Sequence, residues 1–230
     1  MSRDSETLAN AAPIRPSRVQ DPDGTRQNII EVAIREFAEN GLSGARIDEI
    51  AAKTKSSKRM IYYYFGDKEG LYLKALETAY GVVRVGEAQL DLDHLTPVEG
   101  LARLVEFTFD HHRTHEDFIR LVMIENIHHA DYLSKSETIE KLNATAIGKL
   151  DALYRRGVAA GDFRPGLEPI DIHWQISAPC FFNVSNRATF SSVFQRDLST
   201  EKAQAALRAR TVAMILRYVV VPERLPAQAG

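Results

Sequence analysis

Apolar residues recur at helical spacing along most of this chain. The first set falls at intervals of three and four residues, which places its members on one helix face: Ile29, Ile30, Ala33, Ile34 and Phe37. Thr25 can cap the start of this helix, and Asn40-Gly41 can end it in a left-handed conformation. Residues 1–24 are polar, contain three prolines and lack periodicity, so they predict a disordered N-terminal arm.

Two short helices follow, separated by a tight turn. Residues 47–53 predict the first helix, Thr54-Lys55-Ser56 the turn, and residues 57–65 the second helix. At about 100° per residue, the second helix has two opposite faces. One face carries two cations and two phenols, Lys58, Arg59, Tyr62 and Tyr63, and the other carries Met60, Ile61 and Tyr64. Such a pair of helices is typical of a helix-turn-helix that reads DNA.

The rest of the chain predicts longer helices and no strands. Asp67 can cap a long helix that begins at Lys68, and Thr96-Pro97-Val98-Glu99 has the composition of a capping box. Further helices are expected near residues 97–114, 116–130, 137–160, 169–187 and 200–220. We therefore predict an all-α fold in which a three-helix DNA-binding domain, residues 25–84 with its motif at 46–65, is joined by a long helix to a larger helical domain, residues 85–222, followed by a tail at 223–230.

Charge and composition narrow the function. The 230-residue chain has a formal net charge of -2, yet residues 46–59 hold five cations against two acids, as expected when only a small part of the surface binds nucleic acid. The single cysteine, Cys180, and the lack of a signal peptide or membrane-spanning run indicate a cytoplasmic protein. We expect no enzyme and no cofactor, because the sequence has no phosphate-binding loop, nucleophile motif or paired Glu-x-x-His units.

Four short segments resemble the tetracycline-repressor (TetR) family of bacterial regulators. They are Phe37-Ala38-Glu39-Asn40-Gly41, Ile50-Ala51-Ala52, residues 57–65, and Asp67-Lys68-Glu69-Gly70-Leu71. The resemblance covers residues 25–76 at several fixed spacings. It implies that Ser57 caps the recognition helix, that Lys58, Arg59, Tyr62 and Tyr63 face the major groove and its phosphates, and that Lys68 adds a phosphate contact.

The chain departs from the family pattern at two places. Thr54-Lys55-Ser56 stands where the family often has Ala-Gly-Val, so the turn lacks a flexible glycine and an apolar plug. Ala45-Arg46 opens the first motif helix, where serine or threonine is common. We expect a turn of different shape, and we expect Arg46 to reach a phosphate that a hydroxyl usually contacts.

A DNA-reading function also predicts a homodimer. The last helix, Ala203 to Val220, is apolar on more than one face, which indicates burial by a partner chain. One short helix contacts few base pairs, whereas a two-fold dimer presents two helices to the two halves of an inverted-repeat operator in double-stranded DNA.

The leading hypothesis is a repressor that a small, largely apolar molecule releases from its operator. Side-chain size and helical position suggest five residues for the wall of a ligand cavity: Phe107, Phe109, His112, Trp174 and Phe182. Trp174 and Phe182, with Pro179 between them, also fit a core or a dimer interface. The alternatives are a DNA-binding regulator without inducer, a nucleoid-associated factor or, in another class, a metal-binding protein or enzyme that uses His111 and His115 at helical spacing.

Overall fold

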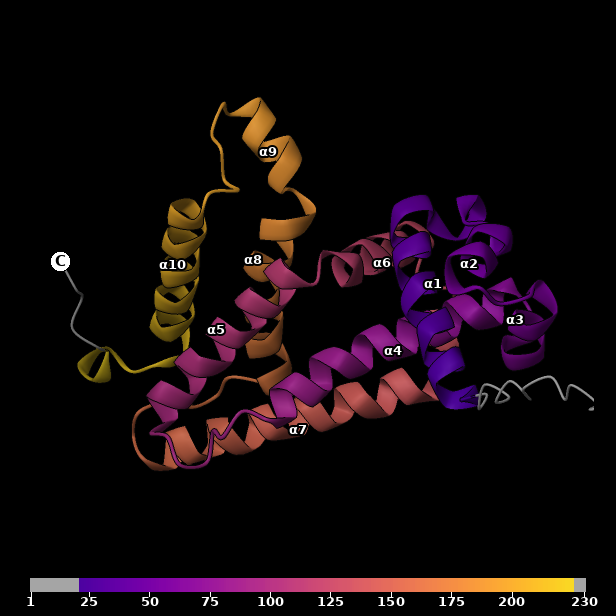
Figure 1. Cartoon of the computed structure of the whole chain (residues 1–230). Coiled ribbons are helices and arrows are strands. Elements are labelled where there is room, and N and C mark those ends of the chain that lie inside the picture. The colour runs from indigo at the N-terminus through magenta and orange to yellow at the C-terminus, as the bar shows by residue number, and fades with distance from the viewer. Residues whose placement is uncertain (1–20, 226–230) are drawn as a thin grey trace, which may run out of the picture.

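Residues 21–225 are described by a computed structural model, in which helices follow one another without a strand (Figure 1). The only sheet-like pairing in this range is an isolated bridge between Phe163 and Val220. The helices are α1 Pro22–Gly44, α2 Ile47–Thr54, α3 Lys58–Phe65, α4 Lys68–Ala88, α5 Pro97–Thr114, α6 Glu116–Ile127, α7 Glu137–Ala159, α8 Pro169–Ser185, α9 Arg187–Val193 and α10 Glu201–Val219, with 3-10 turns η1 Leu133–Lys135 and η2 Pro222–Arg224. The all-α prediction is confirmed.

The first helix begins earlier than the sequence suggested. Asp21 caps α1 by accepting a hydrogen bond from the Gly24 N–H at 2.9 Å, and Pro22 occupies the first helical position. Thr25 is inside the helix and donates to the Asp21 carbonyl, so the prediction of Thr25 as the cap is wrong. An aspartate followed by proline is a stronger start because proline needs no N–H partner there. The predicted disordered arm therefore overran the helix start, and its residues 1–20 lie outside the described range.

The caps at the other predicted helix starts are confirmed. Asp67 accepts a hydrogen bond from the Gly70 N–H at 2.7 Å at the start of α4. The capping box of α5 is complete, because Thr96 accepts from the Glu99 N–H while the Glu99 side chain accepts from the Thr96 N–H. Gly41 was predicted to end the first helix in a left-handed conformation, but it lies inside α1 with φ 66° and ψ 174°, outside the left-handed helical region, and kinks the helix there.

We call α1, α2 and α3 the head and α5 to α10 the body; α4 runs from one to the other (Figure 1). The core of the head surrounds Phe37 and Tyr72, whose rings meet edge to face at 5.0 Å. This core also includes Leu121 of α6 and Ile139 of α7. The head therefore shares its apolar core with two helices of the body.

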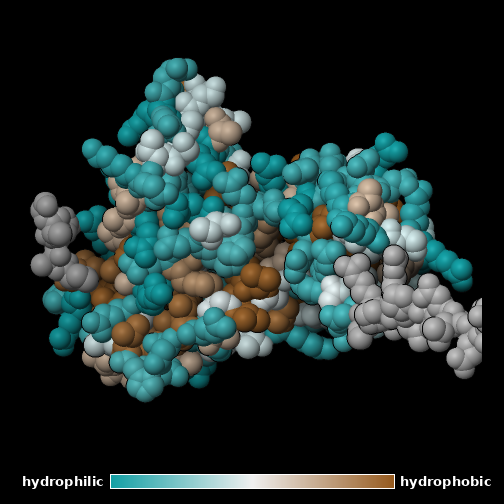
Figure 2. Space-filling model, viewed as in Figure 1, coloured by the Kyte–Doolittle hydropathy of each residue, from teal (hydrophilic) through white to brown (hydrophobic). Residues whose placement is uncertain are grey.

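A second core holds the body together. It is formed by buried residues of α5, α7, α8 and α10, among them Val105, Leu150, Ile176 and Ile215. On the surface seen in Figure 2, hydrophobic residues gather on the body, whereas the head is mostly hydrophilic. Cys180 is fully buried beside this core, and burial raises the pKa of its thiol to about 12, so the thiol stays protonated at neutral pH.

The short helix α9 was not predicted. The sequence suggested that one helix would run to residue 187, but α8 ends at Ser185 and a separate α9 follows at Arg187. No residue of α9 is buried and no side chain caps its start. Figure 1 shows α9 projecting away from the rest of the body. The α8 helix itself continues through Pro179.

Candidate DNA interface and ligand cavity

Helix α3 has the two faces that its sequence predicted. Ser57 caps it by accepting a hydrogen bond from the Met60 N–H at 3.1 Å. Ile61 is fully buried in the core of the head, whereas Tyr62 is 44% and Tyr63 83% exposed. Exposed tyrosines on so short a helix leave a large apolar area in water, which favours a binding role for this face.

The cations around α3 differ in their partners. Arg59 and Arg46 are exposed, and neither forms an ion pair within residues 21–225. Lys58 pairs with Asp48 of α2, but both side chains are half exposed, so the pair contributes little stability. The Lys68 ammonium donates to the Ser43 carbonyl at 3.2 Å, which uses one of its three N–H groups. All four cations therefore retain donors for a polyanion.

The turn between α2 and α3 keeps a left-handed residue without a glycine. Lys55 has φ 52° and ψ 30°, and its N–H bonds the carbonyls at the end of α2. A lysine in this conformation costs more than a glycine would, because its Cβ crowds the backbone. Lys55 thus adopts the left-handed conformation that a glycine would take at lower cost.

A buried carboxylate, which the sequence analysis missed, fixes α2 against α1. Glu36 is almost fully buried and accepts hydrogen bonds from Lys53 at 2.8 Å, Asn40 at 3.1 Å and the Arg46 N–H at 3.4 Å. Burial alone would raise its pKa, but the hydrogen bonds from Lys53 and Arg46 outweigh burial and lower it. Glu36 lies one position before Phe37, on the apolar side of α1. This position is the feature of the sequence that could have predicted its burial.

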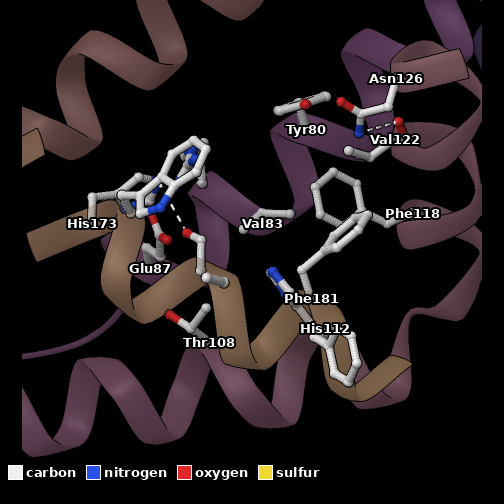
Figure 3. A pocket seen from close by; sticks show the side chains of 15 residues that line it. Tyr80, Val83, Glu87, Thr108, His112, Phe118, Val122, Asn126, His173 and Phe181 are labelled. Atoms are coloured by element: carbon white, nitrogen blue, oxygen red, sulfur yellow. Dashed lines mark hydrogen bonds and ion pairs between the residues drawn. The ribbon is translucent and has the colours of Figure 1, made fainter. Parts of the chain in front are cut away.

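A cavity of about 450 Å³ lies between α4, α5, α6 and α8 (Figure 3). Three of the five residues suggested from sequence, His112, Trp174 and Phe182, line it. Phe107 and Phe109 do not: the Phe107 ring packs against Gly86, and Phe109 is buried beside a smaller cleft. The reason is the register of α5, which turns Thr108 and His112 toward the cavity and the phenylalanines away from it.

Five aromatic side chains from three helices line the cavity. They are Tyr80 of α4, Phe118 of α6, and Trp174, Phe181 and Phe182 of α8. The rings of Tyr80 and Phe118 meet edge to face at 5.1 Å. Figure 3 shows Tyr80, Phe118 and Phe181 directed toward a common space, with His112 below them and His173 at one side. A site of this kind favours an apolar molecule with a few polar groups.

The two charged residues in this wall, Arg84 and Glu87, form an ion pair with each other. Arg84 donates to Glu87 at 2.5 Å, within α4, and also donates twice to Asn143 of α7, at 2.8 and 3.2 Å. Both charged side chains are largely buried. The wall therefore has fixed charges of both signs that already satisfy each other.

The histidines of α5 pack against one another and against aromatic rings. Burial, aided by the charge of His115, lowers the pKa of His111 to about 4, and burial with the charge of His111 lowers that of His112 to about 3. The rings of His111 and His115 stack in parallel at 4.0 Å, and Nδ1 of His115 is bonded to the His111 carbonyl. Nowhere in residues 21–225 do three or more possible ligands gather around one point.

A second buried carboxylate joins the head to the cavity wall. Glu125 of α6 accepts a hydrogen bond from the Tyr72 hydroxyl at 2.9 Å and from the N–H groups of Tyr132 and Leu133 at 3.2 and 2.9 Å. Burial, reinforced by this carboxylate, raises the pKa of Tyr72. On its other face, α6 presents Val122 and Asn126 to the cavity. One helix thus contacts both the head's core and the cavity.

The outward sides of α8 and α10 carry exposed apolar residues. Ile170 is 56% exposed on α8 and Met214 52% exposed on α10, where the exposed Ala205 and Ala209 also lie. Ile215 and Val219 of the same helix are instead buried in the core of the body. Apolar surface on two neighbouring helices favours contact with another protein surface. None of the helices within residues 21–225 combines the length and apolar character needed to span a bilayer.

Two protein-family models match this chain. "Bacterial regulatory proteins, tetR family" matches residues 29–75, and "Tetracyclin repressor-like, C-terminal domain" matches residues 97–215. The chain is 37% identical to the HTH-type transcriptional repressor NicS of Pseudomonas putida over 188 residues, which are 82% of this chain and 89% of NicS.

Two further proteins are similar over different lengths. The HTH-type transcriptional repressor SCO4008 of Streptomyces coelicolor is 34% identical over 110 residues, 47% of this chain and 53% of that protein. The crystal structure of a TetR family transcription regulator from Marinobacter aquaeolei VT8 superposes with a TM-score of 0.66 at 20% identity, covering 86% of this chain and 96% of that one. That structure shares the fold described above.

Proposed function

The chain belongs to the TetR family of DNA-binding transcriptional regulators, and we propose that it is a repressor which binds an inverted-repeat operator as a homodimer and leaves it when a small, largely apolar molecule binds. The observation that carries this proposal is the exposed face of α3. It presents Arg59, Tyr62 and Tyr63 side by side on a helix whose opposite face is buried in the head. Its place of action would be the cytoplasm, where the DNA is.

Base reading is assigned to α3 and backbone contacts to the residues around it. Arg59 and Tyr63 are one helical turn apart, so both can enter the same major groove. Arg46, Lys58 and Lys68 surround them at the ends of α2, α3 and α4, and Ser57 holds the start of α3. Phosphate contacts from these positions would fix the register of the helix on the duplex without reading sequence.

The dimer is assigned to the apolar sides of α8 and α10. A single α3 helix can contact only a few base pairs, and a two-fold axis supplies the second one at a fixed spacing. Exposed Met214 and the small residues of α10 would let a partner helix approach closely, supported by the exposed apolar residues of α8.

Release by a ligand is assigned to α6 and α4. A ligand between Val122 of α6 and Val83 of α4 would separate these helices, and α6 contacts the core of the head through Leu121 and Glu125. Because both heads of a dimer must match a fixed half-site spacing, a small rotation of each would prevent simultaneous docking. A tenfold loss of DNA affinity requires about 1.4 kcal/mol of coupling between ligand and operator.

The test is footprinting of the purified protein on DNA that flanks its own gene. We expect protection of an inverted repeat, in which each subunit contacts one of two equivalent half-sites. Arg59→Ala should need a higher protein concentration for the same protection, while Arg155→Ala, on the exposed surface of α7, should leave protection unchanged. Protection of a long tract without sequence preference would instead indicate a nucleoid-associated factor.

A further inference from the structure

The aromatic cavity also contains polar atoms that have no protein partner. His112 is more than nine-tenths buried, its Nδ1 is buried without a hydrogen bond, and its other nitrogen, Nε2, is the one open to the cavity. Figure 3 shows a nitrogen of this ring pointing into the space near Val83 and Phe181. The hydroxyl of Tyr80 likewise forms no hydrogen bond with any residue in the described range.

These two atoms lie on different sides of the same cavity. Tyr80 belongs to α4 and His112 to α5, and the rings of both approach Phe118 of α6, at 5.1 and 5.7 Å. Neither Nε2 of His112 nor the Tyr80 hydroxyl is fully buried or bonded within the described residues, so a ligand that forms a hydrogen bond with either is favoured over one that forms none. A site that places such atoms among aromatic rings therefore selects for a hydrogen-bonding group on a flat molecule.

The charges of the wall argue against an ionic ligand. Arg84 is satisfied by Glu87 and Asn143, and Glu87 is held by Arg84, so neither side chain needs a counter-ion. The histidines that face the cavity, His112 and His173, are kept neutral by burial, which lowers the pKa of both. An anion or a cation would lose its hydration here without gaining an unpaired opposite charge.

We propose that the cavity binds an uncharged aromatic compound with at least one hydrogen-bonding group, which pairs with Nε2 of His112 or with the Tyr80 hydroxyl. This inference rests on the proposed function, because it describes the effector of the same regulator. A cavity of about 450 Å³ with aromatic walls on α4, α6 and α8 suits a fused two-ring or three-ring system.

The test compares four probes that share one ring system. These are 2-naphthol, naphthalene, 2-naphthoate and the 2-naphthylmethylammonium ion, titrated into the full-length protein at pH 7 by calorimetry. We expect 2-naphthol to bind about fivefold more tightly than naphthalene for one hydrogen bond. We expect each ion to bind about tenfold or more weakly than naphthalene, because its charge is desolvated. Quenching of Trp174, the only tryptophan, locates the binding in the cavity.

Two substitutions separate the hydrogen bond from the apolar contact. His112→Phe and Tyr80→Phe each remove one polar atom and keep an aromatic ring. We expect the double variant to bind 2-naphthol and naphthalene equally, with the affinity for naphthalene unchanged. Neither substitution breaks a hydrogen bond within the described residues, so each should cost little stability, and unchanged operator binding will confirm that each variant is folded.

The outcomes distinguish this inference from the proposed function. Tighter binding of either ion than of 2-naphthol, equal binding of 2-naphthol and naphthalene by the natural protein, or binding of none of the four would overturn the ligand class. Operator binding in a mobility-shift assay would still support the repressor in each of these cases. A protein that binds 2-naphthol as described but protects no operator would keep the ligand class and refute the proposed function.

Discussion

Arg59 and Tyr63 occupy neighbouring positions on the exposed face of α3, and no ion pair within residues 21–225 holds Arg59. We predict that Arg59→Ala and Tyr63→Ala each weaken operator binding by about 1–3 kcal/mol and binding to random DNA by much less. Titration of both DNAs by fluorescence anisotropy measures the two losses. Equal losses on the two DNAs would assign these side chains to phosphate contacts.

Arg46 and Lys68 lie outside α3, at the starts of α2 and α4. We predict that Arg46→Ala and Lys68→Ala weaken binding to all sequences alike and reduce the slope of log affinity against log salt by about 0.9 each, because each phosphate contact releases a counterion. Affinities measured between low and physiological salt give this slope. A changed sequence preference with an unchanged slope would contradict the assignment.

Glu36 makes the head sensitive to acid. Its pKa is lowered in the folded protein, so its contribution is present above the unfolded value of 4.5 and is lost as pH falls through the lower folded value. We predict that Glu36→Gln reduces the free energy of unfolding by roughly 1–2 kcal/mol at pH 7. Urea unfolding at pH 7 and at pH 4 and below should show that the difference in free energy of unfolding between the natural protein and Glu36→Gln shrinks as the pH falls. The exposed Glu39→Gln should change the free energy of unfolding little at any pH. A difference independent of pH would indicate a purely steric effect.

The buried carboxylates of Glu36 and Glu125 show which features of the structure helical periodicity does not predict. Exposed Tyr63 and buried Ile61 follow from helical periodicity, which is a local property. Burial of Glu36 depends on Lys53, 17 positions away, and burial of Glu125 depends on Tyr72, 53 positions away. A glutamate in a helix looks the same in sequence whether or not distant donors surround it.

At the scale of elements, the helices with strong local signals were predicted almost to the residue. The capping box at Thr96 placed the start of α5, and Asp67 placed that of α4. The boundary between α8 and α9 was missed because neither a cap nor a buried face marks it. Cavity residues on α5 were partly misassigned because a shift of one residue rotates a side chain by about 100°.

The α6 helix connects cavity and head through Glu125, and this makes a prediction about local stability. Glu125→Gln would place an amide N–H near the N–H groups of Tyr132 and Leu133, which need an acceptor. We expect the amide hydrogens of these two residues to exchange with solvent at least about tenfold faster, and the free energy of unfolding to fall by about 2 kcal/mol. Hydrogen exchange followed by mass spectrometry measures the first effect.

The control for this change is Glu140→Gln, which alters an exposed carboxylate on α7. It should leave the exchange at residues 132 and 133 as it is in the natural protein. Unchanged exchange in Glu125→Gln would mean that the carboxylate does not hold this segment, and that α6 contacts the head only through apolar residues such as Leu121.

At the scale of the whole molecule, the exposed apolar sides of α8 and α10 predict a two-fold dimer. We expect sedimentation of the natural protein at micromolar concentration to show a dimer. Met214→Glu should shift it toward monomer, because a two-fold axis places two such charges in one interface, and Ala152→Glu on the exposed side of α7 should not. A monomeric natural protein would exclude the proposed mode of operator binding.

The apolar core around Phe37 and Tyr72 takes in Leu121 of α6 and Ile139 of α7. Heads and bodies of this protein are consequently not interchangeable modules. A chimera that joins this head to a foreign body at the end of α4 would leave Phe37 and Tyr72 facing side chains that never evolved to fill the gap. A working chimera has to include the matching surfaces of α6 and α7 together with the head. The suitable junction between the two proteins therefore lies inside the body, beyond α4.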